Sequence, residues 1–367
     1  MKSKCYNPCV IPPLPKPPVP PVNNDLKTIA FIQIDDSSYP PDQVIYESIF
    51  DYWYQDENIP RFPIIDTDGS VSNNLFLLDK YYQEGYRIFL GFTRSTVLQG
   101  VLKWFEEHPD AIGISLRSKA ENLAIPKNIY RMSPMNINII PVILPVLENA
   151  NTVYYIYSQG EVATEEFLIN LKALETEGKI NELKSYAVTP SNLTVGNLQT
   201  FLSGSTSNDV IVVYLFNENP YFDLYSQGLT FSGDQYDILA DQPPSITGTA
   251  QIELNQKLHY ILNIYPNTSE LWRTNSQYLS SKINNDSLIY NSGNLLNALI
   301  MIQSFQKRKN IQYLASHSGV LEFDEFKDII YPSYLILLYD GIANIYLKES
   351  LFFNDPLLGK FNANFLP

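Results

Sequence analysis

The stretch YRIFLGFTRSTVLQGVLKWFEE, residues 86–107, carries the pattern that decides the fold. Its first five residues form a short apolar run of strand type, which ends at Gly91. Apolar side chains then recur at the spacing of one helix face, at Val97, Val101, Leu102 and Phe105. The stretch therefore predicts a strand over 86–90, a short polar loop, and a helix over 95–107.

The same alternation continues on both sides of this unit. Strands are expected at 28–34, 61–65, 111–115 and 129–132, with helices at 41–55 and 73–83. A second series has expected strands at 152–158, 183–188 and 209–216, and expected helices at 161–174 and 194–202. Strand–helix alternation produces parallel sheets with helices on both faces. Two such series in succession predict two α/β lobes.

Other segments depart from this alternation. Residues 137–147 are very apolar but contain Pro141 and Pro145, which predicts a kinked or broken helix. Runs of strand type at 333–339 and 343–348 flank an Asp-Gly pair, which favours the positive φ of a tight turn and predicts a hairpin. Helical patterns also occur at 269–281 and 291–307.

Composition excludes several classes of protein. The net charge of −14 argues against a nucleic-acid-binding protein and against electrostatic docking to anionic membranes. No apolar run reaches the ~18 residues of a membrane span, so no membrane insertion is expected. With only two cysteines and three separated histidines, neither a disulfide scaffold nor a histidine-rich metal centre is expected. We therefore expect no metal and no cofactor.

Motifs of catalysis are also missing from the sequence. It contains no G-x-G-x-x-G, no phosphate-binding G-x-x-x-x-G-K-[ST] loop and no G-x-S-x-G. Residues 66–69 (DTDG) begin like a calcium loop, but the later ligands do not fall into place, so we interpret them as a turn. No catalytic residue is expected, and the protein is not expected to be an enzyme.

Residues 8–22, PCVIPPLPKPPVPPV, favour an extended polyproline II conformation. One interpretation is a stiff linker or disordered tail, and the other is a segment that docks onto a protein partner. No apolar signal segment is visible ahead of it. The localisation therefore stays open between extracytoplasmic, if a signal was removed, and a virion or host cytoplasm. The oligomeric state is not indicated.

Several pieces come in an order that resembles the type I periplasmic-binding-protein superfamily, especially its branched-chain amino-acid and amide-binding branch. They are Gly91 with the loop TRST (93–96), the segment ISLRSK (114–119), the strand NIYRM (128–132) and the segment GVLEFD (319–324). The resemblance spans roughly residues 27–350. It implies two Rossmann-like lobes with parallel sheets, joined by a three-segment hinge and closing on a small ligand as a Venus flytrap does.

The resemblance also implies a division of the chain. A proline-rich tail (1–26) precedes lobe 1, which would comprise 27–148 and 249–325. Lobe 2 would comprise 149–248 and 326–350, and a C-terminal tail would follow over 351–367.

Candidate ligand contacts follow from the matching positions. In the first lobe they are the loop Thr93, Arg94, Ser95 and Thr96, which in the family holds a ligand carboxylate, and the loop Ser115, Arg117, Ser118 and Lys119. Helix N-termini at the carboxyl ends of strands offer free N–H groups to such ligands. For Ser95, simple capping of the helix is the alternative. For Arg117 and Lys119, which replace small residues of the family, the alternative is solvated surface.

The second lobe matches the family less well. Its stretch 159–163 (QGEVA) lacks the family's Tyr-Gly pair, which removes an aromatic ligand contact. Asp234 and Asn217 are the remaining candidate contacts, Asp234 as a partner for a ligand ammonium or as a turn-stabilising residue.

Two functions stay open at this point. The first is a non-catalytic binding protein for an amino acid, an amide or a similar polar metabolite, which closes its lobes on the ligand. The second is a structural or interaction protein, such as a virion component, that reuses the fold without a ligand and docks through its proline-rich N-terminus. An AT-rich source, suggested by abundant Asn, Ile and Tyr, is compatible with a large DNA virus.

Overall fold

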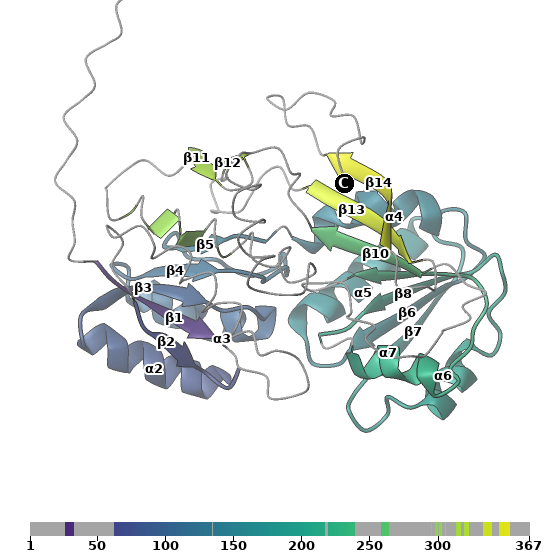
Figure 1. The fold of residues 1–367 in the computed structure, drawn as a ribbon, viewed down its shortest axis with the longest axis horizontal. Coiled ribbons are helices and arrows are strands. Elements are labelled where there is room, and N and C mark those ends of the chain that lie inside the picture. Colours follow the sequence, from purple (N-terminus) through teal and green to yellow (C-terminus); the bar gives the residue numbers. More distant parts are fainter. Residues whose placement is uncertain are drawn as a thin grey trace, which may run out of the picture.

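The computed structural model describes two lobes, each built on its own sheet (Figure 1). The described residues are 26–32, 62–133, 135–216, 219–238, 258–263, 295, 298, 299, 301, 302, 305, 313–316, 319–322, 333–339 and 345–352. The expected helices at 41–55 and 269–281, Asn217 and the proline-rich segment 8–22 lie outside them.

Lobe 1 is an entirely parallel five-stranded sheet in the order β2-β1-β3-β4-β5. Its elements are β1 (Lys27–Ile32), β2 (Ile64–Asp66), α2 (Val71–Gln83), β3 (Tyr86–Gly91), α3 (Ser95–Glu107), β4 (Ile112–Ser115) and β5 (Ile129–Arg131). Helix α2 begins where Ser70 accepts a hydrogen bond from the backbone N–H of Asn73. The preceding Asp66 and Asp68 side chains accept bonds from backbone N–H groups two residues on, so this segment is a turn, as predicted.

Lobe 2 is a seven-stranded sheet in the order β14-β13-β10-β9-β8-β6-β7. Its parallel part and helices are α4 (Ile140–Leu147), β6 (Val153–Ser158), α5 (Val162–Thr176), β7 (Leu183–Val188), α6 (Val195–Leu202), β8 (Val210–Tyr214), α7 (Asn219–Ser226), β9 (Asp234–Ile238) and β10 (Leu258–Asn263). The antiparallel hairpin of β13 (Ser333–Tyr339) and β14 (Ile345–Phe352) completes the edge, which confirms the predicted hairpin.

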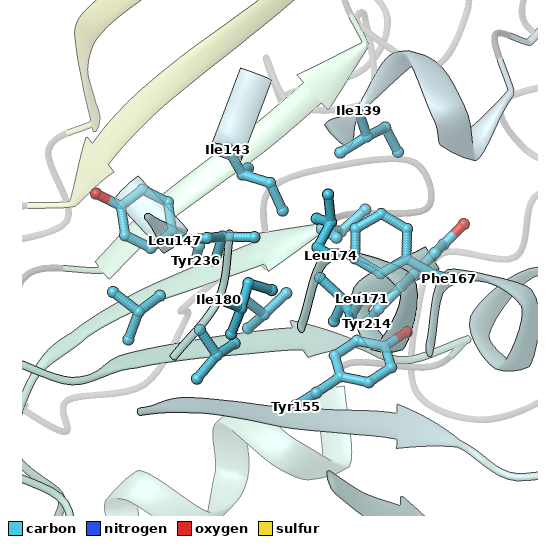
Figure 2. Close-up of a cluster of buried hydrophobic side chains, with 14 of the residues drawn as sticks. Ile139, Ile143, Leu147, Tyr155, Phe167, Leu171, Leu174, Ile180, Tyr214 and Tyr236 are labelled. Carbon is cyan, nitrogen blue, oxygen red and sulfur yellow. The ribbon is translucent and has the colours of Figure 1, made fainter. Parts of the chain in front are cut away.

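Alternation along the strands of lobe 2 builds two cores, one on each face of the sheet. On one face, Tyr155 of β6, Tyr214 of β8 and Tyr236 of β9 pack against α4 and α5 (Figure 2). On the other face, Tyr154 and Ile211 pack against α6 and α7. In lobe 1, a third core lies between the sheet and helices α2 and α3.

The segment 137–147, predicted to be a kinked or broken helix, is divided between a 3₁₀ turn and α4, and Pro145 lies inside α4. A 3₁₀ turn, η1 (Asn136–Asn138), precedes α4, and Pro141 lies in the first turn of the helix, where a missing N–H costs little. The buried face of α4 packs into the core of lobe 2, not lobe 1. The first passage between the lobes therefore falls between β5 and α4, ahead of the predicted boundary at residue 148.

The resemblance implied that residues 249–325 belong wholly to lobe 1, which is wrong for part of this range. Strand β10 lies in lobe 2, because Leu258–Ile261 pair in parallel register with β9. The chain then returns to lobe 1, where Phe305 packs edge-on against Tyr130 of β5, and passes back to lobe 2 as β13. Strand β14 extends to Phe352, two residues into the predicted C-terminal tail. The described elements thus place three passages between the lobes.

Two short antiparallel strands, β11 (Tyr313–Ser316) and β12 (Gly319–Glu322), form a separate two-stranded sheet. Among the described residues, no helix has both the length and the apolar character that crossing a membrane requires. Within the same part of the chain, no group of three His, Cys, Asp or Glu side chains is placed to hold a metal ion.

Candidate ligand-binding site between the lobes

The loop that follows β3 is shaped by the close approach of two strands. Gly91 has a φ of +144°, and a Cβ there would lie 2.0 Å from the carbonyl oxygen of Phe31 on β1. Only glycine fits this position. Phe92 follows with a φ of +50°, an unusual value for a side-chain-bearing residue. These two residues turn the chain into α3. Arg94, the N-cap of this helix, and Thr96, in its first turn, then lie next to lobe 2.

Ser95 is 4% exposed and its hydroxyl is used inside lobe 1. Its oxygen accepts hydrogen bonds from the backbone N–H groups of Lys119 and Ala120, both at 3.1 Å, and lies 3.0 Å from the Ser118 hydroxyl. The N-cap position of α3 belongs to Arg94, so the predicted capping by Ser95 is wrong by one residue. Ser95 joins the two loops that carry the candidate contacts.

The second loop of lobe 1 is equally enclosed. Ser115 and Ser118 are fully buried, and the Ser115 hydroxyl donates to the carbonyl oxygen of Phe92 at 2.8 Å. Lys119 is 5% exposed, and its ammonium lies 5.9 Å from the centre of the Tyr214 ring of β8. The alternative of a solvated surface lysine is therefore wrong for Lys119. Its charge lies at the boundary between the lobes.

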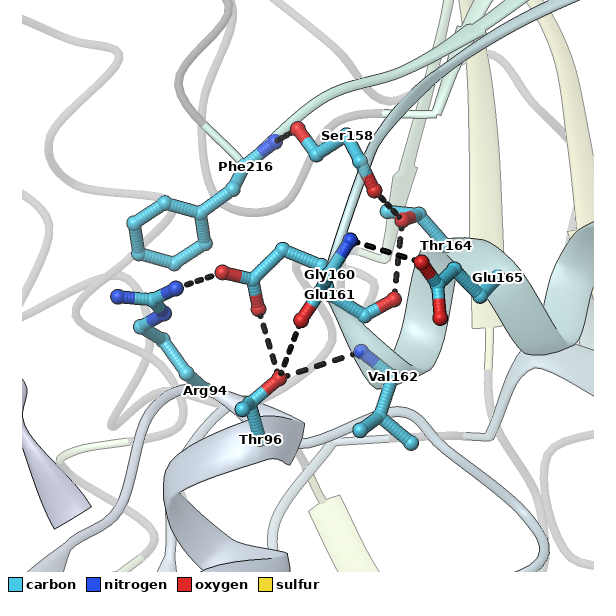
Figure 3. A network of polar contacts seen from close by, with 9 residues as sticks. All are labelled: Arg94, Thr96, Ser158, Gly160, Glu161, Val162, Thr164, Glu165 and Phe216. Atoms are coloured by element: carbon cyan, nitrogen blue, oxygen red, sulfur yellow. Dashed lines mark hydrogen bonds and ion pairs between the residues drawn. The ribbon is translucent and has the colours of Figure 1, made fainter. Parts of the chain in front are cut away.

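Arg94 and Thr96 meet lobe 2 at Glu161, the residue before α5 (Figure 3). The Arg94 guanidinium forms an ion pair with one carboxylate oxygen of Glu161. The other oxygen accepts a hydrogen bond from the Thr96 hydroxyl at 3.0 Å, and that hydroxyl accepts one from the backbone N–H of Val162 at 3.2 Å. These charge-assisted bonds connect the first turn of α3 to the start of α5.

Aromatic side chains of lobe 2 lie against both cations. The Arg94 guanidinium carbon is 4.2 Å from the centre of the Phe216 ring, within the range of a cation–π contact. The backbone N–H of Phe216 is held by the Ser158 hydroxyl at 2.9 Å, which links the carboxyl ends of β8 and β6 (Figure 3). Tyr214 and Phe216 thus supply the aromatic character that the altered stretch 159–163 lacks.

A second set of contacts joins the lobes along α5. The Glu166 carboxylate accepts hydrogen bonds from the backbone N–H groups of Glu121 and Asn122, and from the Asn122 side chain, at 2.5–2.7 Å. Burial, and then the charge of Glu166, raises the pKa of Glu121. The fully buried Asn136 of η1 donates to the carbonyl oxygen of Ala163 at 2.7 Å and accepts from the Tyr214 hydroxyl.

The remaining predicted contacts are distributed differently. Thr93 and Arg117 are half-buried in the two loops of lobe 1. Asp234 lies at the amino end of β9, in register with Val210 at the start of β8, whereas Tyr214 ends β8 at the other edge. Asp234 therefore does not join the group around Arg94. Its carboxylate lies 3.5 Å from the His259 ring on β10.

The residue that sequence reasoning missed is Glu161. The stretch 159–163 lacks the family's aromatic residue, and its sequence alone does not indicate what the Glu161 carboxylate contacts. One signal was available, because Glu161 lies between the carboxyl end of a strand and a helix N-terminus, where parallel lobes place ligand contacts. Its two partners are 65 or more residues away in the chain, so only the folded structure identifies them.

The two sheets, one parallel and one parallel apart from its β13–β14 edge, the three passages between them and the contacts at strand carboxyl ends define a type I periplasmic-binding-protein fold. Solved structures of this fold superpose on most of the chain. LivK, a leucine-binding protein of Thermotoga maritima, is 14% identical, with a TM-score of 0.67 over 89% of this chain and 99% of that one. An R. palustris ABC-transporter solute-binding protein in complex with benzoate is 13% identical, with a TM-score of 0.65 over 89% and 96%.

A third similar structure is LivJ of Streptococcus pneumoniae in complex with isoleucine. It is 13% identical, with a TM-score of 0.64 over 89% of this chain and 99% of that one. No protein-family model matches the sequence, and no curated protein matches it either. At these identities the likeness establishes the fold, which confirms the resemblance and the fold class expected from the sequence.

Proposed function

We propose that this protein binds a small molecule that carries a carboxylate between its two lobes and does not transform it. One observation carries the proposal: two cations of lobe 1, Arg94 and Lys119, lie against two aromatic rings of lobe 2, Phe216 and Tyr214. Cations provide charge-assisted hydrogen bonds to a carboxylate, and aromatic rings provide apolar contact for the rest of the ligand. Thr93 and Arg117 are proposed as further contacts from the same two loops.

The similar structures support this class of ligand. Their own ligands, named as leucine, isoleucine and benzoate, all pair a carboxylate with an apolar group. Lys119 replaces a small residue of the family pattern, and its positive charge favours an acidic ligand. We therefore narrow the expected ligand from a polar metabolite in general to an apolar or aromatic carboxylate.

The test is the thermal unfolding of the full chain with leucine, isoleucine, benzoate and the uncharged analogue benzamide. A ligand that binds only the native state stabilises it by about 2.7 kcal/mol at 100 times its dissociation constant, which raises the melting temperature. We expect at least one carboxylate to raise it and benzamide not to do so. An equal response to benzoate and benzamide would contradict the role of the cations.

A pair of matched variants locates the site. Lys119→Met removes the buried ammonium while keeping a long apolar side chain, and we expect it to abolish the response to carboxylates. The control is Lys103→Met on the exposed face of α3, where the side chain is 83% exposed. The control should respond as the wild type does. A response that survives Lys119→Met would place the ligand elsewhere.

A second candidate function is a structural or interaction protein that keeps the fold without a ligand. It is favoured by the Arg94–Glu161 ion pair, in which a carboxylate of the chain itself already neutralises a candidate ligand contact. Such a protein would dock through residues 8–22, which lie outside the described part of the chain. Deleting residues 1–24 would then abolish partner binding while leaving the unfolding temperature of the lobes unchanged.

A further inference from the structure

We propose that Glu161 is a built-in carboxylate that fills the anion-binding groups of lobe 1, holds the lobes together without a ligand and sets the selectivity of the site. This inference rests on the proposed function, because Arg94, which pairs with Glu161, is one of the two cations proposed for the ligand. It makes Glu161 a specificity-determining residue, since an incoming carboxylate has to displace it.

The contacts of Glu161 are those of a bound carboxylate. One oxygen pairs with the guanidinium of Arg94, and the other accepts the hydroxyl proton of Thr96 at 3.0 Å. The Thr96 oxygen is oriented for this donation because it accepts the Val162 N–H at 3.2 Å (Figure 3). The residue is only 8% exposed, so water competes little for these groups.

The position of Glu161 directly before α5 would allow its side chain to cap that helix, but the side chain does not do so. Its backbone is extended, with φ −97° and ψ 115°, as at other helix N-caps, yet its side chain makes no capping bond to α5. The Glu165 carboxylate binds the N–H of Gly160 instead, at 2.8 Å, and the Thr164 hydroxyl donates to the carbonyl oxygen of Ser158. The Glu161 side chain is thereby directed across the lobe boundary.

Tethering makes Glu161 a strong competitor. A group attached to the same chain through a short linker acts at an effective concentration on the order of millimolar. A free monocarboxylate therefore binds to Arg94 and Thr96 only when its own contacts exceed this internal competition. Replacing Glu161 by its neutral isostere should tighten carboxylate binding by about tenfold or more, because the competing charge is gone.

The experiment compares wild type, Glu161→Gln and the control Glu177→Gln, which removes an exposed carboxylate at the C-terminal end of the same helix. Small-angle scattering of each ligand-free protein measures the radius of gyration, and calorimetric titration measures the affinity for benzoate. We expect Glu161→Gln alone to show a larger radius of gyration and a tighter benzoate complex. Circular dichroism checks folding. If Glu161→Gln does not fold, Glu161→Asp replaces it, because its side chain is one CH₂ group shorter and should weaken the contacts with Arg94 and Thr96.

The two readouts separate this inference from the proposed function. An unchanged radius of gyration with unchanged or weaker benzoate binding would overturn the role of Glu161. A larger radius of gyration with no benzoate binding to either protein would uphold Glu161 as a contact that closes the lobes and reject the ligand class. Equal changes in Glu177→Gln would also overturn the proposal, because they would reflect loss of charge alone.

Discussion

Asp237 is a fully buried carboxyl group on the face of lobe 2 that packs against α7. The Gln235 amide donates to it at 2.7 Å, and the hydroxyls of Tyr221 and Tyr225 in turn donate to the Gln235 oxygen. Burial raises the pKa of Asp237 well above its ordinary value, because the charged form would lose its hydration. The folded protein therefore favours the neutral acid.

This shift predicts a pH-dependent free energy of unfolding. Above the ordinary pKa of an aspartate, ~3.9, the unfolded chain loses the Asp237 proton while the folded chain keeps it, so stability falls as pH rises towards the folded-state pKa. We expect Asp237→Asn, which preserves the acceptor for Gln235, to remove this slope and to raise stability at pH 8 by about 1 kcal/mol or more. Urea unfolding from pH 5 to 9 measures it.

The matched control is Glu107→Gln, which removes a carboxylate at the end of α3 whose side chain is 60% exposed. It should leave the slope unchanged. An Asp237→Asn protein with the wild-type slope would mean that Asp237 is ionised in the folded state.

At the scale of elements, helix α5 connects the lobes. Its outward face contacts lobe 1 through Val162 and Ala163, which pack against the core of that lobe, and through the hydrogen bonds of Glu166 to the loop at 121–122. Its opposite face contributes Phe167 and Leu171 to the core of lobe 2. One helix thus belongs to the packing of both lobes.

The acceptor role of Glu166 gives a prediction at this scale. Glu166→Gln replaces one carboxylate oxygen by an NH₂ group that faces hydrogen-bond donors. Either the bond from the Glu121 N–H or the pair of bonds from Asn122 is therefore lost, because these use different oxygens of Glu166. We expect a loss of about 2–3 kcal/mol of unfolding free energy, because buried N–H groups are left without an acceptor. Urea unfolding measures the loss, with Glu177→Gln as control. A change under about 0.5 kcal/mol would show that water replaces the carboxylate.

At the scale of the whole molecule, the shared interface decides how the protein unfolds. A chain of 367 residues with two sheets often unfolds lobe by lobe. Here Asn136, Glu161 and Glu166 bind across the boundary, and three passages of chain join the lobes. We expect a single calorimetric transition whose van't Hoff and calorimetric enthalpies agree. Two resolved transitions would show that these contacts contribute little to stability.

The elements that the sequence predicted best have a simple apolar pattern. Helix α3 spans the predicted residues 95–107, and β7 the predicted 183–188. Two of the missed elements break that pattern: β9 (DQYDI) carries the buried polar residues Gln235 and Asp237, and α7 (NPYFDLYS) is short and contains a proline. Their burial depends on hydrogen bonds to one another, which periodicity does not register.

At the candidate site, too, the sequence predicted some features and not others. Both loops of lobe 1 follow strands β3 and β4, as the strand–loop–helix pattern predicted, whereas their contact with a ligand stays a prediction. The roles of individual residues were harder to assign. Ser95 is occupied by bonds to the neighbouring loop, and the partner of Arg94 comes from the other lobe. Contacts between distant segments decide these roles, and the local sequence does not contain them.

The three passages of the chain also determine the order in which the protein is made. Lobe 2 begins with α4 and β6, yet its sheet is closed by β13 and β14, which leave the ribosome almost two hundred residues later. The packing of lobe 1 is likewise incomplete until Phe305 has been synthesised and contacts Tyr130. Neither lobe completes its packing from its early segments alone, so lobe 1 reaches its final form only after Phe305 has been synthesised, and lobe 2 only after β14.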